Sequence, residues 1–271
     1  PAKGVVPNPA AFHICYCHSP MRYLWDMYHE YMREAGIITR FFMNLLIPGL
    51  RLRDAVSANL VDYFIANSSW VAKRIRRCYN RDAEVVFPPV SVDAYISRER
   101  KPEDFYLFFG QLAGYKRADI AMEACAASGR KLIVAGAGAK KGDIKKYEKT
   151  GLVRFTGRVS DEEAASLYSR ARALLFPGIE DFGIIPVEAA AAGCPVIAYR
   201  AGGALDTVKE NITGIFFDEQ NAASLSGALA RFESIEASFK DREPFTAQAR
   251  SFSREVFLER IKNIVEKRTR I

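Results

Sequence analysis

From residue 105 onward, short apolar runs alternate with segments of helical pattern, and this alternation constrains the fold more than any other feature. Apolar strands that alternate with helices are typical of a parallel sheet covered on both faces. The predicted strands are 105–109, 131–135, 153–156, 173–176, 196–199 and 214–217. The predicted helices are 117–128, 161–170, 186–192, 203–208, 222–232 and 252–266. The sequence therefore predicts the α/β class.

The first hundred residues follow a similar pattern with fewer strands, which are expected at 11–17, 61–66 and 84–87. An amphipathic helix is expected over 22–53, broken near Pro48 because proline lacks the N–H that a helix interior needs. The pair Asn67-Ser68 can cap a further helix over 70–79. Residues 91–104 are the predicted linker between two domains.

The charge balance is basic, with a net charge of +7 and a pI near 9.1. This fits a protein that handles anionic ligands or lies near anionic lipid, and the balance alone selects neither. No apolar run reaches the ~18 residues of a spanning helix, and no signal peptide is predicted. Five cysteines without a C-x-x-C pair favour a reducing cytoplasm over a disulfide framework.

Two glutamates eight positions apart, Glu180 and Glu188, lie between a predicted buried strand and an Ala-rich helix. Gly183 lets the backbone approach a ligand closely, and Pro186 suits the first turn of a helix. The start of a helix attracts phosphate through its free N–H groups and its dipole. Carboxylates on either side of such a site suit a ligand with hydroxyls at both ends and phosphates between them, as in a nucleotide sugar.

Two more loops follow predicted strands and carry glycine or positive charge. Lys116 and Arg117 come after Gly110, where cations can neutralise the charge of a phosphate group. The loop that begins at Gly136 invites a dinucleotide-binding interpretation, but its spacing is not G-x-G-x-x-G. This second loop is expected either to border a nucleotide pocket or to be a plain turn.

Five blocks occur in the order found in a known family. They are Gly110–Arg117, Phe155–Asp161, Glu180–Glu188, Gly193–Ala198 and Ala201–Asp206, with a weaker match at His18–Asp26. From about residue 60 to its end, the chain resembles the retaining glycosyltransferases of group 1, also called glycosyltransferase family 4.

The resemblance implies the GT-B fold, with two Rossmann-like α/β domains built on parallel sheets. Residues 102–250 would form the nucleotide-sugar-binding domain, and 251–271 a helix that crosses back to the N-terminal domain. Residues 1–101 would hold the acceptor-side domain and the linker. This domain is shorter than the family's, so it is expected to be incomplete and to lack several β/α units.

The resemblance also implies roles on the donor side. Glu180 would contact the hydroxyls of the transferred sugar, and Glu188 would grip the ribose. Lys116 and Arg117 would neutralise the diphosphate near Gly110, with Gln111 standing where the family usually has an arginine. The remaining donor-binding positions implied are Phe182, Gly183 and Ile184 through their N–H groups, Arg158 and Val159 at the base, and Gly136.

On the acceptor side, the resemblance implies that His18 faces the reaction centre as a catalytic residue. The acceptor would be lined by Arg22, Tyr23, Trp25 and Asp26. With three histidines in the chain no metal-ligand cluster is expected, and enzymes of this fold generally need no metal or other cofactor.

The predicted function is transfer of a hexose, with retention, from a nucleotide diphosphate sugar to a saccharide or lipid-linked saccharide. The tracts 16–23 and 115–119 look like bacterial polysaccharide mannosyltransferases, which favours GDP-mannose as donor. The apolar and basic stretch 37–52 could rest on the inner face of the membrane or be core. Basic residues near 73–77 lack interleaved aromatics, so no nucleic-acid partner is expected.

Three alternatives stay open. A sugar-nucleotide epimerase of the same fold would turn over the donor without an acceptor. A non-catalytic nucleotide-sugar-binding module would bind the nucleotide without transfer or hydrolysis. A dinucleotide oxidoreductase fits least, because no acidic residue stands about 20 positions after the Gly136 loop.

Overall fold

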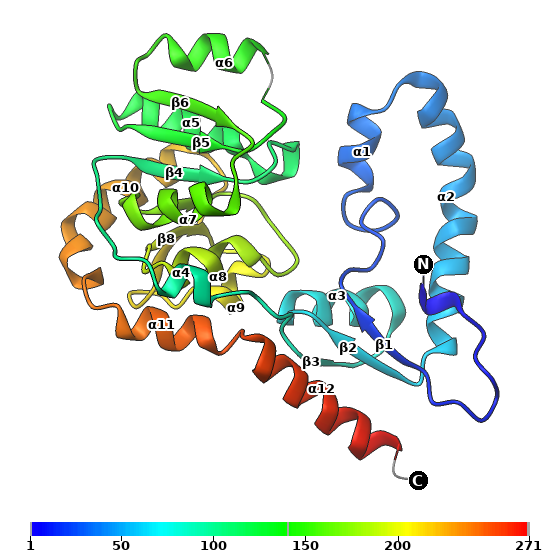
Figure 1. The fold of residues 1–271 in the computed structure, drawn as a ribbon. Helices are drawn as coiled ribbons and strands as arrows, with labels where there is room; N and C mark the ends of the chain where they lie inside the picture. The colour runs from blue at the N-terminus through cyan, green and yellow to red at the C-terminus, as the bar shows by residue number, and fades with distance from the viewer. Residues whose placement is uncertain (1, 140, 270–271) are drawn as a thin grey trace. The chain divides into compact units, whose positions relative to one another are not determined.

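In the computed structural model, which describes residues 2–139 and 141–269, the described chain forms two compact units. Unit 1 comprises the residues up to Phe87 and those from Glu259, and unit 2 comprises Pro88–Leu258. Each unit contains a parallel sheet with helices, so the predicted α/β class with two parallel sheets is confirmed (Figure 1). The predicted linker, 91–104, belongs to unit 2.

Within the described residues, the sheet of unit 2 has six parallel strands in the order β6-β5-β4-β7-β8-β9. The strands are β4 (Tyr106–Phe109), β5 (Leu132–Ala135), β6 (Val153–Gly157), β7 (Leu174–Phe176), β8 (Val196–Tyr199) and β9 (Gly214–Phe217). Each lies within two residues of its prediction, since continuous apolar runs are what a doubly covered strand requires. The order reverses between β4 and β7, and such a switch point is where open α/β sheets bind ligands.

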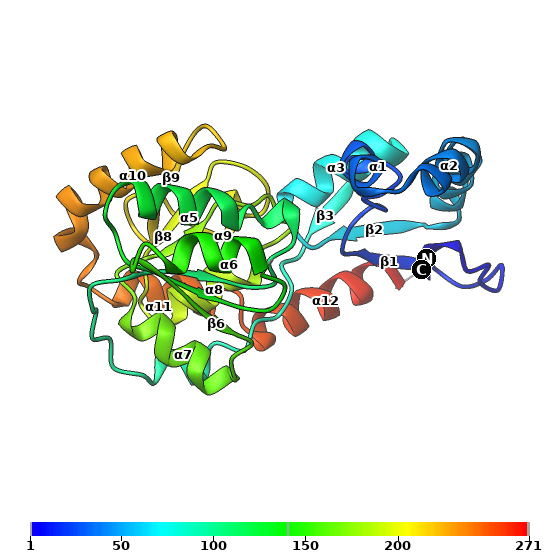
Figure 2. The same cartoon turned by 90° about the horizontal axis from the view of Figure 1, so that it is seen from above.

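The two faces of this sheet are covered by different helices. Tyr106 and Phe108 of β4 pack in a core with α5 and α10, whereas Leu107 packs with α7 and α8. This alternation follows from the two-residue period of a strand. Figure 2 shows α5 and α10 on one side of the sheet and α7 on the other.

The described helices of unit 2 include three that the sequence pattern did not predict, α4, α6 and α11. The set is α4 (Asp93–Ile96), α5 (Ala118–Ala127), α6 (Lys141–Glu148), α7 (Asp161–Arg170), α8 (Ile184–Ala191), α9 (Ala204–Thr207), α10 (Ala222–Ile235) and α11 (Glu243–Arg250). The last helix, α12 (Arg254–Thr269), begins in unit 2 and ends in unit 1. At the start of α7, Ser160 and Glu163 form a capping box.

In the described part of unit 1, three parallel strands follow the order β1-β2-β3. They are β1 (Ile14–Cys17), β2 (Tyr63–Ala66) and β3 (Ala83–Val85), and the helices are α1 (Tyr28–Glu34), α2 (Ile37–Ser57) and α3 (Ser69–Tyr79). The Oγ of Ser68 accepts a hydrogen bond from the N–H of Val71 at 3.0 Å, which confirms the predicted cap of α3.

The predicted break in the long helix of unit 1 is wrong. The chain leaves the helix at Ala35 and Gly36, and α2 then runs without interruption through Pro48. Proline costs one backbone hydrogen bond inside a helix, but the carbonyl of Asn44 that loses its partner lies on a helix with a wide exposed face. Water can therefore satisfy that carbonyl.

A buried carboxylate fixes α2 to the rest of unit 1. Asp54 pairs with Lys3 at 2.8 Å and accepts hydrogen bonds at 2.9 Å from Trp25 Nε1 and Tyr79 Oη. A buried charge is tolerated when it is paired and hydrogen-bonded in this way. The opposite face of α2 carries apolar side chains that are exposed, among them Ile37 at 86%.

Candidate functional site

The loops that hold the predicted site leave two neighbouring strands at the switch point of the unit 2 sheet. Residues 110–117 follow β4, and residues 177–183 follow β7. The loops touch, because a Cβ on Gly178 would lie 2.8 Å from the Cα of Lys116. A glycine is therefore required at this approach of backbone to backbone.

Glycines also join the ends of β4, β5 and β6. The N–H of Gly110 donates to the carbonyl of Ala135 at 2.9 Å, and the N–H of Gly136 donates to that of Gly157 at 2.7 Å. A Cβ on Gly136, whose φ is 142°, would lie 1.8 Å from the carbonyl oxygen of Gly110. The loop after Gly136 is thus fixed to the start of the loop that carries Lys116.

Lys116 and Glu180 form an ion pair across the two loops, with Nζ and Oε1 2.9 Å apart. Their side chains are 14% and 19% exposed, so the pair is largely shielded from water. Partial desolvation strengthens the attraction, and each charge holds the other in place. The structure brings together two of the three residues predicted to be catalytic.

The loop that carries Glu180 is held by the pair Gly202-Gly203. The N–H of Gly203 donates to the carbonyl of Glu180 at 2.8 Å. A Cβ on Gly202 would lie 2.5 Å from that oxygen, and one on Gly203 would lie 2.1 Å from the carbonyl oxygen of Phe182. The block that begins at Ala201 therefore positions the glutamate loop through its backbone.

The helix start predicted to receive phosphate is α8, which begins at Ile184. Its N-cap, Gly183, has a φ of 86°, a conformation that suits glycine. The ring of Phe182 is buried and lies edge-on to Phe252, with centroids 5.6 Å apart. Side-chain packing thus anchors this turn, while the N–H groups at a helix start and the dipole favour an anion.

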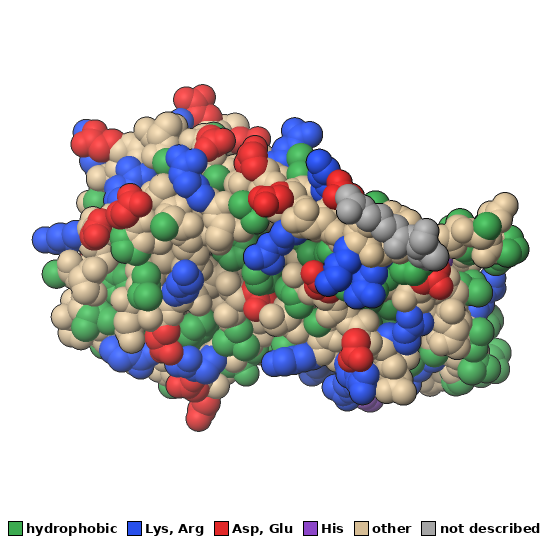
Figure 3. All heavy atoms as spheres, turned by 90° about the horizontal axis from the view of Figure 1, so that it is seen from below, with side chains coloured by type: hydrophobic (Ala, Val, Ile, Leu, Met, Phe, Trp, Pro, Cys, Tyr) green, Lys and Arg blue, Asp and Glu red, His purple; other side chains and the backbone are tan. Residues whose placement is uncertain are grey.

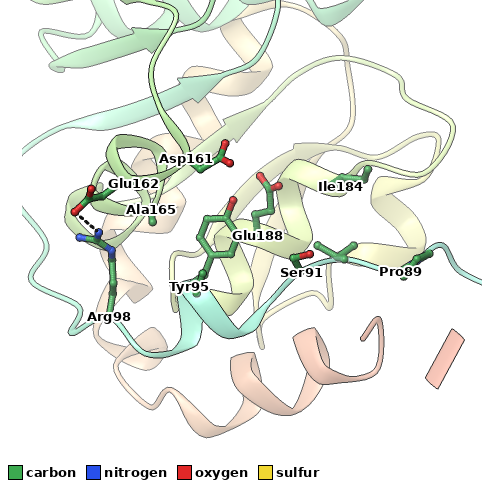
Figure 4. A pocket seen from close by; sticks show the side chains of 11 residues that line it. Pro89, Ser91, Tyr95, Arg98, Asp161, Glu162, Ala165, Ile184 and Glu188 are labelled. Carbon is green, nitrogen blue, oxygen red and sulfur yellow. Dashed lines mark hydrogen bonds and ion pairs between the residues drawn. The ribbon is translucent and has the colours of Figure 1, made fainter. Parts of the chain in front are cut away.

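Glu188 lies in the second turn of α8 and lines a pocket of about 570 Å³ (Figure 4). Such a volume is within the range of small-molecule sites. Tyr168 donates a hydrogen bond to Oε2 of Glu188 at 3.0 Å, and the phenol of Tyr95 points toward the same carboxyl group. Burial raises the pKa of the Glu188 carboxyl, and hydrogen bonds from Tyr168 and Tyr95 oppose that rise.

The sequence pattern does not predict several residues in and around the pocket. Tyr95 lies in the stretch predicted as a linker and lines the pocket, and Tyr168, in a predicted helix, contacts the pocket residue Glu188. Asp161 lines the pocket beside Arg98 and Glu162, whose side chains pair at 3.4 Å. Asp161 ends one of the five matching blocks, so a signal for it was present. No local pattern marks Tyr95 or Tyr168, because only tertiary structure brings them to Glu188.

The second predicted cation, Arg117, is held by hydrogen bonds to Asp119 and Gln220 and not by an ion pair with Glu180. Its Nε and Nη2 each donate to the Asp119 carboxylate at 3.1 Å, and Nη1 donates to Gln220 at 3.3 Å. Its φ of 53° is unusual for a residue with a side chain, and such strain is typical of functional sites. Gln111, in the same loop, is exposed.

Arg158 and Val159, predicted to hold the base, follow β6. The Arg158 side chain is exposed, while Val159 is half-buried and packs against the core on the α7 and α8 side of the sheet. Exposure and packing do not test a contact with the base, and both roles stay predictions.

The acceptor-side residues lie in unit 1. His18 is exposed just after β1, with its ring edge-on to Tyr16 at 5.1 Å between centroids. Trp25 contacts Asp54 as described above, and the Asp26 carboxylate pairs with the Arg74 guanidinium. Arg22 is half-buried and Tyr23 exposed. Trp25 and Asp26 thus have structural contacts, and the acceptor roles stay predictions.

The side chains and helices of the described residues bear on metal binding and on membrane insertion. Among residues 2–139 and 141–269, no group of three His, Cys, Asp or Glu side chains comes together as metal ligands. Over the same residues, no helix has the length and apolar character needed to cross a bilayer. Basic and acidic side chains are interspersed on the face shown in Figure 3.

The chain is similar in sequence and in fold to known proteins. The sequence profile of the family described as "Glycosyl transferases group 1" matches residues 93–252. The D-inositol 3-phosphate glycosyltransferase of Nocardioides sp. (strain ATCC BAA-499 / JS614) is 29% identical over an alignment 232 residues long, which covers 71% of this chain and 50% of that protein. The chain thus spans about half the length of this relative.

A second relative is the GDP-mannose-dependent alpha-(1-6)-phosphatidylinositol monomannoside mannosyltransferase of Mycobacterium tuberculosis. It is 34% identical over an alignment 111 residues long, which covers 36% of this chain and 29% of that protein. Among solved structures, Anabaena Alr3699/HepE in complex with UDP and glucose superposes with a TM-score of 0.69 at 17% identity, covering 93% of this chain and 71% of that one. This likeness supports the predicted GT-B class of fold.

Proposed function

Because the chain belongs to the glycosyl transferases group 1 family, we propose that it transfers a hexose from a nucleotide diphosphate sugar to a saccharide or lipid-linked saccharide. The observation that carries this proposal is the Lys116–Glu180 ion pair at the switch point of the unit 2 sheet. A cation and a carboxylate, beside the start of α8, match a substrate that joins diphosphate to a polyol.

The proposed roles follow from charge and position. Lys116 meets the diphosphate and offsets the charge that grows on it as the sugar departs. Glu180, released from part of its pairing with Lys116, accepts hydrogen bonds from sugar hydroxyls. Glu188, in the pocket beyond the start of α8, accepts hydrogen bonds from the ribose hydroxyls.

For the reaction itself we propose retention of configuration by front-side attack. An acceptor oxygen forms a bond to the anomeric carbon while the bond from that carbon to the diphosphate oxygen breaks. The acceptor proton passes to the departing diphosphate, so no enzyme nucleophile is used. The products are the glycosylated acceptor and the nucleoside diphosphate.

GDP-mannose is the proposed donor, in a pathway that builds polysaccharide or a lipid-linked saccharide. The support is the tract 115–119 in the Lys116 loop and the named donor of the mycobacterial relative. The proposed compartment is a reducing cytoplasm, since all five cysteines are free in the described residues. Burial raises the pKa of the Cys17 and Cys78 thiols to about 12 and about 11, which makes them poorly reactive.

Contact with an anionic lipid surface is proposed for α2. Its exposed apolar face includes Phe41, Leu45 and Leu52, its exposed charged residues Arg40 and Arg53 are both basic, and its one acid, Asp54, is buried. The protein should sediment with vesicles of 70% phosphatidylcholine and 30% phosphatidylglycerol, and Phe41→Asp should reduce this. Equal sedimentation of the two proteins, or none, would count against the contact.

The deciding experiment is calorimetric titration with GDP, UDP and ADP, followed by incubation with GDP-mannose and saccharide acceptors. We expect micromolar binding of GDP, weakened by Glu188→Ala and unchanged by Glu123→Ala, an exposed position on α5. Glu180→Ala should mainly reduce transfer. Absence of nucleotide binding would refute the proposal. Donor turnover without an acceptor would favour an epimerase, and binding without turnover a binding module.

A further inference from the structure

The segment that precedes β4 forms a fixed wall of the pocket that contains Glu188. The guanidinium of Arg242 donates to the carbonyls of Arg98 at 2.8 Å and Ile96 at 3.1 Å. At the other end of the segment, the N–H of Val90 donates to the carbonyl of Phe252 at 2.9 Å. The short helix α4 is therefore held against the body of unit 2, and it presents Tyr95 to the pocket (Figure 4).

Two tyrosines from different elements converge on one carboxylate. Tyr168, in α7, is fully buried and donates to Oε2 of Glu188 at 3.0 Å. Tyr95, in α4, packs edge-on against the ring of Tyr168, with centroids 5.8 Å apart, and its phenol points toward the Glu188 carboxyl group (Figure 4). Ring packing and hydrogen bonding together leave the carboxylate little freedom to rotate.

The number of acceptor sites left on Glu188 is informative. An ionised carboxylate offers about four lone-pair sites, and it can only accept hydrogen bonds. The phenol of Tyr168 uses one of these sites, and the phenol of Tyr95, which points toward the carboxyl group, is placed to use a second. The two that remain match the two neighbouring hydroxyls of a ribose, each of which can donate one hydrogen bond.

We propose that Tyr95 is a positioning residue that, together with Tyr168, orients Glu188 to select nucleotides by their ribose 2′,3′-diol. The inference rests on the proposed function of the pocket as a nucleotide site. Tyr95 acts through Glu188 and need not touch the nucleotide. Its removal should therefore reduce affinity only for ligands that carry the diol.

The test compares binding of GDP and 2′,3′-dideoxy-GDP to wild type and to Tyr95→Phe by calorimetry. The substitution keeps the ring that packs on Tyr168 and removes the phenol O–H that points toward the Glu188 carboxylate. Affinity for GDP should fall about tenfold. Affinity for the dideoxy nucleotide should stay within about twofold. In a Glu188→Gln background, Tyr95→Phe should have no further effect on GDP binding.

The matched control is Tyr106→Phe. Tyr106 is also buried, and its phenol also donates to a glutamate, Glu233, at 2.8 Å. This control should cost stability without changing the affinity for either nucleotide.

Equal weakening of both nucleotides by Tyr95→Phe would overturn the inference, because it would make Tyr95 a general wall of the pocket. No weakening of GDP binding would overturn it as well. A wild type that binds GDP and dideoxy-GDP equally would refute the inference alone. A wild type that binds no nucleoside diphosphate would instead refute the proposed function on which the inference rests.

Discussion

Neutralising each member of the Lys116–Glu180 pair, singly and together, separates a structural ion pair from a substrate contact. Lys116→Gln leaves a carboxylate that is 19% exposed without its partner, and Glu180→Gln leaves an ammonium that is 14% exposed. A fully buried pair loses 3–5 kcal/mol when one partner is removed, and an exposed pair loses 0–1. The intermediate exposure predicts about 1–2 kcal/mol for each single change.

The double variant carries the decisive information. Removing both charges leaves no unpaired ion, so stability should recover most of what either single change lost. Binding of GDP should not recover, because Lys116 is expected to contribute a charge-assisted hydrogen bond of about 1.5–3 kcal/mol to the diphosphate, or roughly 10- to 150-fold in Kd. Urea unfolding and calorimetry with GDP measure the two quantities on the same proteins.

The control is the Arg130–Glu233 pair of unit 2, which has a separation of 2.6 Å and side chains that are 19% and 28% exposed. Neutral glutamines there should change stability and leave GDP affinity intact. The reasoning on Lys116 would be refuted if the Lys116→Gln/Glu180→Gln double variant bound GDP as tightly as wild type. In that case Lys116 would be only a structural partner of Glu180.

Three further predictions concern the same unit. GDP affinity should be constant above the raised pKa of Glu188 and should fall as the pH drops through that pKa, because protonation of the carboxylate removes a hydrogen-bond acceptor. Calorimetry across pH should show no such fall in GDP affinity for Glu188→Gln. Gly203→Ala should lower stability by about 1–3 kcal/mol and weaken GDP binding, because its Cβ would meet the Phe182 carbonyl, whereas Gly227→Ala on an open helix face should be neutral or stabilising in thermal unfolding. Ser160→Ala should cost about 1 kcal/mol in urea unfolding through loss of the α7 cap, without changing GDP affinity.

The strands and the glutamate loop could be predicted because local signals specify them. Continuous apolar runs such as 132–135 indicate strands that are covered on both faces of a sheet. The pair Ser160 and Glu163 indicates a helix start from local sequence alone. The spacing of Glu180 and Glu188 around a helix start likewise survives into the structure as two carboxylates near α8.

What could not be predicted depends on contacts between distant segments. Tyr95 reaches Glu188 because Arg242 and Phe252, both distant in sequence, hold the segment around α4, and no pattern near residue 95 encodes those contacts. At Pro48 a local signal is present, but tertiary packing overrides it. Proline does remove a backbone hydrogen bond from a helix. Burial of Asp54 and Ile47 on the inner face of α2 nevertheless keeps the chain helical on both sides of Pro48.

The contact between Gly136 and Gly110 has a consequence for engineering donor preference. The two residues begin different loops, but their backbones are in contact, so each loop can keep its conformation only while the other does. Replacing the loop after β4 with one from a relative would therefore leave a clash or a gap at the loop after β5. The Gly110 and Gly136 loops should be transplanted as one block, with the end of β6 that binds Gly136 included.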